Sequence, residues 1–154
     1  MVHKPKHKVH SFRGLLGDGG QDEINLERQN ANVAYRILKL ELMPYNLNSN
    51  QEACVKVFRE KQGALVFDFD FSDTDLLAAA YYTNSSAADT YSEDLTVIFD
   101  NTLFSRNIYI THENNASGVE VNYYIEIEEV PVAAATLMQL KLGVARKLNL
   151  QQDL

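Results

Sequence analysis

The chain has 154 residues, 45% of them hydrophobic, so it is long enough for one domain with an ordinary core and too apolar for a disordered protein. Its formal charge is -7, and its only cysteine, Cys54, excludes an intrachain disulfide and argues against a cysteine-based zinc site. No apolar run is long enough to span a bilayer, and residues 1–13 lack the apolar stretch of a signal peptide, so we expect cytoplasmic synthesis and no membrane contact.

The first thirteen residues are basic, whereas the rest of the chain is acidic. They contain four cations and no acid, so residues 14–154 must carry -11 for the chain to total -7. This asymmetry favours contact with phosphate or with an acidic protein surface. Four glycines between residues 14 and 20 predict a flexible hinge. We therefore expect residues 1–20 to be a basic arm and hinge that contacts nucleic acid or a neighbouring subunit through Lys4, Lys6, Lys8 and Arg13.

Between residues 21 and 131, short segments of alternating apolar and polar residues are separated by turn-forming clusters. The sharpest alternation, in residues 64–71, would place Phe67, Phe69 and Phe71 on one face of a strand, and residues 34–43 would place Leu38 inward with Leu40 and Leu42. Residues 76–82 suit either a strand or a helix. The expected strands are 24–26, 34–43, 52–59, 64–71, 95–99, 107–111 and 121–128. This spacing predicts an all-β antiparallel sandwich, either of general form or a jelly roll.

Residues 132–154 change to helical spacing. Pro131 lies just ahead of the pattern, and Arg146 and Lys147 fall in its last turn, where cations oppose the helix dipole. We expect an amphipathic C-terminal helix that packs on its own sandwich or on a neighbouring subunit through Leu137, Leu140, Val144 and Leu148.

Residues suited to metal binding or catalysis form no recognised motif. The histidines of the first ten residues lie in a segment without predicted structure, beside lysines that repel a cation. The aspartates at 68, 70, 73 and 75 offer oxygen ligands for calcium, but they lack EF-hand spacing, and a solvated strand with its turn is the simpler interpretation. No nucleophile elbow or phosphate-binding glycine loop is present. We expect no enzymatic activity, no cofactor and no metal.

The tyrosines occur partly as adjacent pairs. Tyr81-Tyr82 and Tyr123-Tyr124 must each send one ring to either face of a strand. We assign Tyr82 and Tyr124 to packing against another subunit or against the C-terminal helix. A sugar platform, or plain solvent exposure of the hydroxyls, would fit the same pattern.

Three stretches of the sequence resemble small virion structural proteins of marine bacteriophages. They are Ile98-Phe-Asp-Asn-Thr-Leu-Phe104, Asn107-Ile-Tyr-Ile-Thr-His112 and Val121-Asn-Tyr-Tyr-Ile-Glu-Ile-Glu128. The resemblance spans roughly residues 21–148 and includes no diagnostic functional motif. It implies a structural role in a particle, as a capsid, decoration or tail component. A basic arm ahead of a sandwich also resembles jelly-roll coat proteins, whose N-termini face packaged nucleic acid.

These observations predict a β-sandwich domain over residues 21–131, between the basic arm and the C-terminal helix. We expect a capsid or capsid-decoration subunit, assembled in the host cytoplasm and located in the virion. It would act by self-assembly into a homo-oligomer or with other virion proteins. The alternative is a carbohydrate- or receptor-binding module of a phage fibre or bacterial surface protein, using loops 46–50, 84–91 and 114–118. A metal-dependent hydrolase is a third option.

Overall fold

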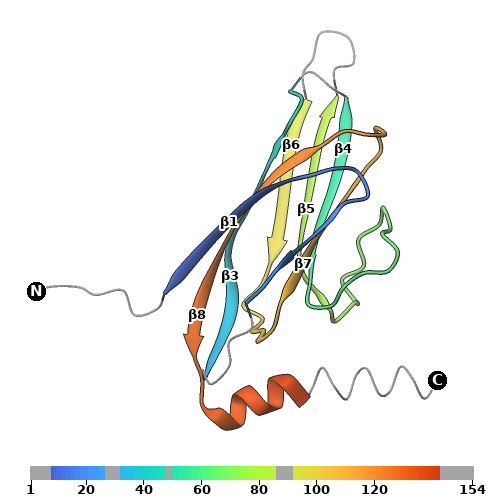
Figure 1. The fold of residues 1–154 in the computed structure, drawn as a ribbon. Helices are drawn as coiled ribbons and strands as arrows, with labels where there is room; N and C mark the ends of the chain where they lie inside the picture. The colour runs from blue at the N-terminus through green and yellow to red at the C-terminus, as the bar shows by residue number, and fades with distance from the viewer. Residues whose placement is uncertain (1–7, 27–31, 48–49, 86–91, 143–154) are drawn as a thin grey trace, which may run out of the picture.

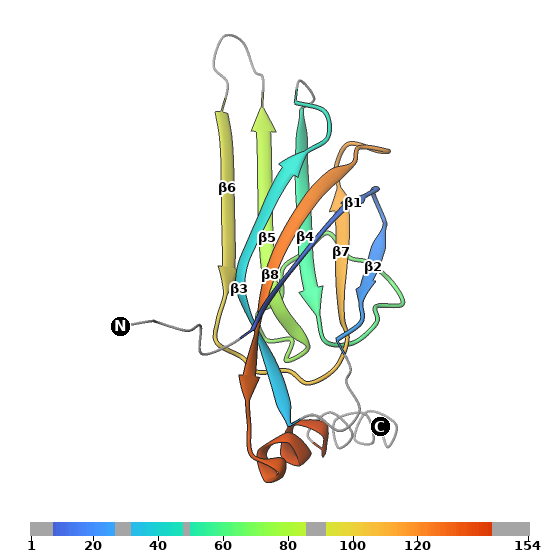
Figure 2. The ribbon, with the colours of Figure 1, turned by 60° about the vertical axis from the view of Figure 1, so that its left-hand side comes forward.

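The protein is a sandwich of two antiparallel β-sheets (Figures 1 and 2). The computed structural model describes residues 8–26, 32–47, 50–85 and 92–142. Within these ranges one sheet has the strand order β1-β8-β3 and the other the order β2-β7-β4-β5-β6. The strands are β1 (Val9–Leu16), β2 (Gln21–Ile24), β3 (Val33–Pro44), β4 (Gln51–Phe58), β5 (Leu76–Ser85), β6 (Ser92–Phe99), β7 (Ile108–Asn114) and β8 (Val121–Pro131). The predicted all-β sandwich is confirmed.

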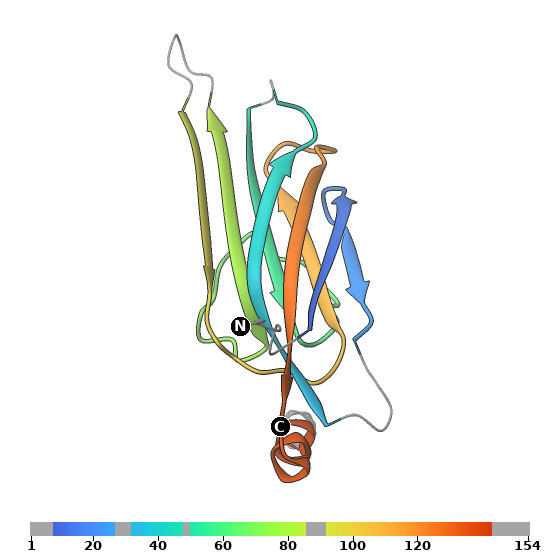
Figure 3. The same ribbon diagram turned by 90° about the vertical axis from the view of Figure 1, so that its left-hand side faces the viewer.

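Early strands pair with late ones. β1 pairs with β8, β2 with β7 and β4 with β5, each antiparallel. β8 also pairs with β3, β7 pairs with β4, and β6 extends the larger sheet beside β5. The three-stranded sheet therefore joins the first strand of the chain to the last, as Figure 3 shows.

Alternating side chains fill the space between the sheets. From Val121 to Ile127, β8 alternates buried with half-buried residues, as the sequence predicts. Its Ile125 and Ile127 join Ile108 and Ile110 of β7 in one core, and all four are fully buried. Each such side chain contributes about 1.5–3 kcal/mol through removal from water.

The second half of the predicted arm is a strand. β1 pairs with β8 along its whole length, from Val9 opposite Glu128 to Leu16 opposite Val121. The expectation of an arm without regular structure is therefore wrong from Val9 onward. Lys4 and Lys6 lie outside the described residues.

The predicted glycine hinge is also wrong, because its glycines belong to β1 and to a tight turn. Gly14 lies in β1 under the ring of Tyr123, and a Cβ at this position would come within 2.7–2.8 Å of that side chain. After the strand, the Gly20 N–H donates to the Gly17 carbonyl at 2.9 Å, and Gly19 has a φ of 78°. Glycine is favoured at that φ because side chains crowd the left-handed region.

An irregularity in β3 changes which side chains face the core. The pairing of β3 with β8 shifts between Ile37 and Lys39. Leu40 and Leu42 are buried as predicted, but Leu38 is 40% exposed and does not face inward. An extra residue in one strand reverses the alternation on one side of the bulge, so Ile37 fills the core instead.

The strand predicted at residues 64–71 does not form. Residues 59–75, which we call the crossing segment, consist of turns and irregular structure. β4 pairs with β5 on one edge and with β7 on the other, so neither edge of β4 is open to a further strand. Instead, the Lys56 Nζ donates to the carbonyl oxygens of Val66 and Asp68, at 2.8 and 2.7 Å, and holds the segment against the outer face of the sheet. The ambiguous residues 76–82 belong to β5.

The predicted C-terminal helix begins at Ala134 and is described as far as Leu142. It lies beyond the ends of β3 and β8, away from the body of the sandwich (Figures 1 and 3). Val144 and Leu148 lie outside the described residues. Among the helical residues that the structure describes, none form a helix long and apolar enough to cross a bilayer.

Candidate functional site

A buried polar cluster ties the turn after β1 to β7. His112 is fully buried, and its Nδ1 lies 3.1 Å from the carbonyl oxygens of both Leu16 and Gly17. Nδ1 donates to these oxygens, and Nε2 lies 3.3 Å from the Asn114 Nδ2. Nε2 can accept a hydrogen bond from that amide only if the imidazole is neutral. Burial lowers the pKa of His112 and so favours that form. Because Asn114 also donates to Gln51, the partners of this cluster are internal, and its role is to close one end of the sandwich.

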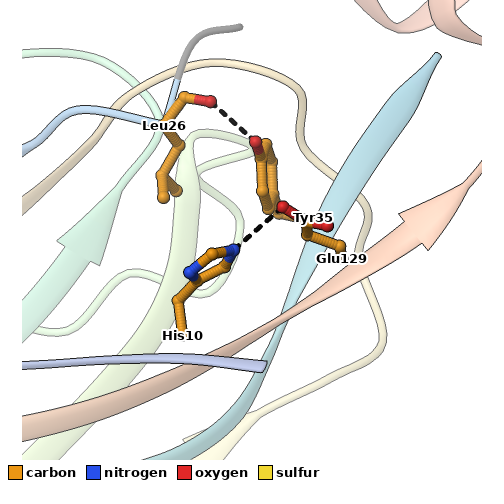
Figure 4. A network of polar contacts seen from close by, with 4 residues as sticks. All are labelled: His10, Leu26, Tyr35 and Glu129. Carbon is orange, nitrogen blue, oxygen red and sulfur yellow. Dashed lines mark hydrogen bonds and ion pairs between the residues drawn. The ribbon is translucent and has the colours of Figure 1, made fainter. Parts of the chain in front are cut away.

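A second polar group lies at the opposite end, where β1, β3 and β8 meet (Figure 4). The His10 Nε2 lies 2.9 Å from the Glu129 Oε1, and the Tyr35 hydroxyl donates to the Leu26 carbonyl at 2.8 Å. Glu129 continues the inward-facing series of β8 and is half-buried, and the His10 ring is one of its polar partners. His10 therefore fastens the first strand to the last.

Two of the four aspartates considered for calcium accept hydrogen bonds in local turns of the crossing segment. The Asp70 Oδ1 accepts hydrogen bonds from the Ser72 hydroxyl and N–H, at 2.5 and 2.9 Å, and these lower the pKa of Asp70. The Asp73 Oδ1 accepts from the Asp75 N–H at 2.9 Å. Among the side chains that the structure describes, no three His, Cys, Asp or Glu come together in a group that could hold a metal ion.

The crossing segment creates an apolar groove on the outer face of the five-stranded sheet. Phe71 is 65% exposed on one wall, and Ile98 of β6 is 51% exposed on the other. Phe69 packs edge-to-face on Tyr81, with ring centroids 6.2 Å apart. The small side chain of Ala79 leaves the floor low between them, and the hollow measures about 140 Å³. We call this the β5–β6 groove; it is lined by Phe69, Phe71, Ala79, Tyr81, Thr96 and Ile98.

A wider and more polar groove crosses the outer face of the three-stranded sheet. It measures about 590 Å³, and we call it the β8 groove. The ring of Tyr124 lies within it, its hydroxyl donating to Glu126 at 2.7 Å, while the Lys39 Nζ lies 5.9 Å from the ring centroid. Hydrogen bonding to Glu126 raises the pKa of Tyr124. The side chains around it include Arg13, Leu15, Glu41, Met43 and Asn122.

The residues predicted to make contacts are dispersed. Lys8 is exposed just before β1, and Arg13 is exposed on the outer face of β1, at the β8 groove. Tyr124 faces outward, but Tyr82 is only 6% exposed within the core, where another subunit cannot reach it. Tyr81 is the outward-facing ring of that pair, the reverse of our assignment.

The helix is only partly covered. Of the predicted stripe, Leu137 and Leu140 are half-buried, and Leu140 lies beside residues 103–106 of the loop before β7. Met138 and Leu142, on another side of the helix, are 63% and 47% exposed. One side of the helix therefore packs on its own chain. In the part of the chain that the structure describes, the side with Met138 and Leu142 is exposed.

Sequence reasoning missed the β5–β6 groove. Its signal was the alternation of Phe67, Phe69 and Phe71 with aspartates, which we interpreted as a strand. Phe69 and Phe71 instead line a hollow whose remaining walls come from β5 and β6.

No protein-family model matches this chain, and no curated protein sequence matches it either. The resemblance to virion proteins therefore stays a prediction.

Proposed function

We propose that this protein is a virion structural subunit, of the capsid or capsid-decoration type, that acts by associating with copies of itself and with other virion proteins. The observation that carries the proposal is the exposure of large apolar side chains on both outer faces of the sandwich. Phe71 and Ile98 lie on one face, and Leu15 and Met43 on the other. Large groups of exposed apolar side chains are rare on monomeric proteins, and they commonly mark interaction surfaces.

The winding of the chain supports the same proposal. The nested pairs β1·β8, β2·β7 and β4·β5 follow the jelly-roll pattern, with the difference that β6 pairs with β5 and not with β3. Jelly rolls build viral capsids and also lectin domains. Because a fold hosts several functions, the winding is compatible with assembly and with sugar binding and does not decide between them.

Charge suggests how subunits would attract their partners. Lys8 and Arg13 are exposed at the start of the chain, and Lys4 and Lys6 precede them in sequence. In an acidic protein these cations would neutralise acidic groups of a neighbour or phosphates of packaged nucleic acid. Four charges bind nucleic acid weakly alone, but many copies in one shell act together.

The β8 groove favours a second candidate, a carbohydrate- or receptor-binding module. Tyr124 offers a ring face, and Arg13, Glu41 and Asn122 offer polar groups beside it. Parts of the loops first considered for sugar binding, residues 48–49 and 86–91, lie outside the described residues. Among the described ones, the Asn84 Nδ2 donates to the Leu47 carbonyl and the Asn115 Oδ1 accepts from the Glu52 N–H, so these two groups already have partners within the chain.

Light scattering over a range of protein and salt concentrations tests the first proposal. We expect oligomers that grow with protein concentration and that persist at high salt where apolar contacts dominate. A monomer under every condition would rule out the shell subunit. Saturable glycan-array binding by that monomer, lost on Tyr124→Ala substitution, would favour the carbohydrate module instead.

A further inference from the structure

Two apolar surfaces of the same chain have complementary shapes. One is the convex side of the helix, where Met138 and Leu142 lie one turn apart. The other is the concave β5–β6 groove, around Phe71 and Ile98. Each of these four side chains is at least 47% exposed, so the helix does not fill the groove of its own sandwich.

The groove is long enough for more than one side chain. Beyond Phe71, Ala79 and Ile98 it continues as a second hollow of about 240 Å³ that reaches Phe99 and Asp100. The two hollows share Phe71, Ala79 and Ile98, so they form one depression along the outer face of β5 and β6. An amphipathic helix that binds in a groove inserts side chains spaced three or four residues apart, as Met138 and Leu142 are.

The charged residues at the two surfaces are opposite in sign. Lys141 lies between Met138 and Leu142 in sequence and is the one charged residue among the helical residues that the structure describes. Asp100 lines the far end of the groove. Attraction between the lysine of one copy and the aspartate of another favours contact between the helix and the groove.

We propose that the C-terminal helix of one copy docks in the β5–β6 groove of another copy, with Met138 and Leu142 inserted between Phe71 and Ile98 and with Lys141 near Asp100. The contact is heterologous, because the surface on one partner differs from the surface on the other. Repeating it gives a ring or an open chain of subunits rather than a closed two-fold dimer. This inference rests on the proposed function of assembly and names the surfaces that would carry it.

Disulfide trapping between two different variants tests the docking directly. The native Cys54 should form few cross-links, because it is 1% exposed and burial raises its pKa to about 11. A Met138→Cys chain mixed with an Ile98→Cys chain under mild oxidation should give a covalent dimer that contains one of each. A Met43→Cys chain is the matched control, since Met43 is 66% exposed and Met138 is 63% exposed, but Met43 lies on the opposite sheet. It should not cross-link to Met138→Cys above background.

A second measurement keeps the inference testable without cross-linking. Met138→Glu should weaken self-association by about tenfold or more, because it places a charge at the centre of an apolar contact. Leu47→Glu should leave self-association unchanged, because Leu47 is as exposed as Met138, at 63%, but lies in the loop after β3. If the unmodified chain forms oligomers but neither the mixed disulfide nor the Met138→Glu effect is found, the docking is wrong and the assembly proposal stands. If Met43→Glu alone dissociates the oligomers, the β8 groove is the interface instead. A monomer throughout overturns both proposals.

Discussion

His112 couples the stability of the sandwich to pH through a single side chain. Its Nδ1 faces two carbonyl oxygens and its Nε2 faces the amide of Asn114, so a neutral ring satisfies both nitrogens. Protonation would make Nε2 a donor facing another donor and would place a positive charge at a fully buried position. The folded protein therefore resists protonation of this residue more than the unfolded chain does.

Acid should weaken the fold through His112 before the carboxylates titrate. Burial holds its folded pKa below the ordinary value of 6.5, so between those two values the unfolded chain binds the proton and the folded protein does not. The stability contributed by the neutral ring is complete above about pH 6.5 and is lost as pH falls towards the folded pKa, with a slope of up to about 1.4 kcal/mol per pH unit. Urea unfolding of the native chain and of His112→Gln, at about pH 7.5, 6.5 and 5.5, measures this contribution. The variant should show a flatter slope, and equal slopes would refute the assignment.

At the scale of single elements, the alternation of apolar and polar residues identified extended segments of the chain. It did not identify the strands with which they pair. β8 was predicted closely because one of its faces lies on the core for most of its length. Residues 64–71 have an equally regular pattern, yet they follow β4, whose two edges are already paired. Pairing between distant strands decides which extended segments become strands, and one sequence does not display it.

Local irregularities were equally hidden from the sequence. The bulge in β3 turns Leu38 outward, although leucine fits the inward series before Leu40 as well as any residue would. Gly14 suggested a hinge by composition alone, whereas its function in β1 depends on Tyr123, more than a hundred residues away. The position of that ring follows from the register of β1 on β8.

Replacing Gly14 with alanine should reveal this packing. The new Cβ would lie 2.7–2.8 Å from the Tyr123 ring and hydroxyl, so the ring must move and its 2.8 Å hydrogen bond to Asp22 must weaken. We expect a loss of about 1–3 kcal/mol in the free energy of unfolding, as for other overpacked sites. Gly17→Ala is the matched control, because nothing lies within 4 Å of a Cβ there, and thermal denaturation of both variants compares them. If Gly14→Ala were as stable as the control, residue 14 would tolerate a side chain, as a hinge would.

At the scale of the whole molecule, the sequence did not indicate where the candidate surfaces lie. The charge of the N-terminus and the apolar spacing of the helix both pointed to association, and Arg13 and the helix do present side chains to solvent. The β5–β6 groove could not be foreseen, because its walls come from the crossing segment and β6, which meet only in the folded chain. A surface assembled from distant segments leaves no periodic pattern in any one of them.

The first and last strands that the structure describes should depend on each other for stability, which makes residues 9–16 part of the fold rather than an appendage. Removing residues 1–13 deletes most of β1, including the His10 contact with Glu129 and the Phe12 side chain that packs on the core, and it exposes the paired edge of β8. We expect this truncation to lower the melting temperature substantially and to promote aggregation through the freed strand edge.

Removing residues 1–7 leaves β1 and its full register with β8, so the melting temperature should stay close to that of the intact chain while Lys4 and Lys6 are lost. Circular dichroism melts measure the stability of the two truncated proteins, and light scattering measures their association. If loss of residues 1–7 lowers association but leaves stability unchanged, Lys4 and Lys6 belong to contacts between subunits. Equal stability of both truncations would show instead that β1 is dispensable and that the pairing of first strand with last does not hold the sandwich together.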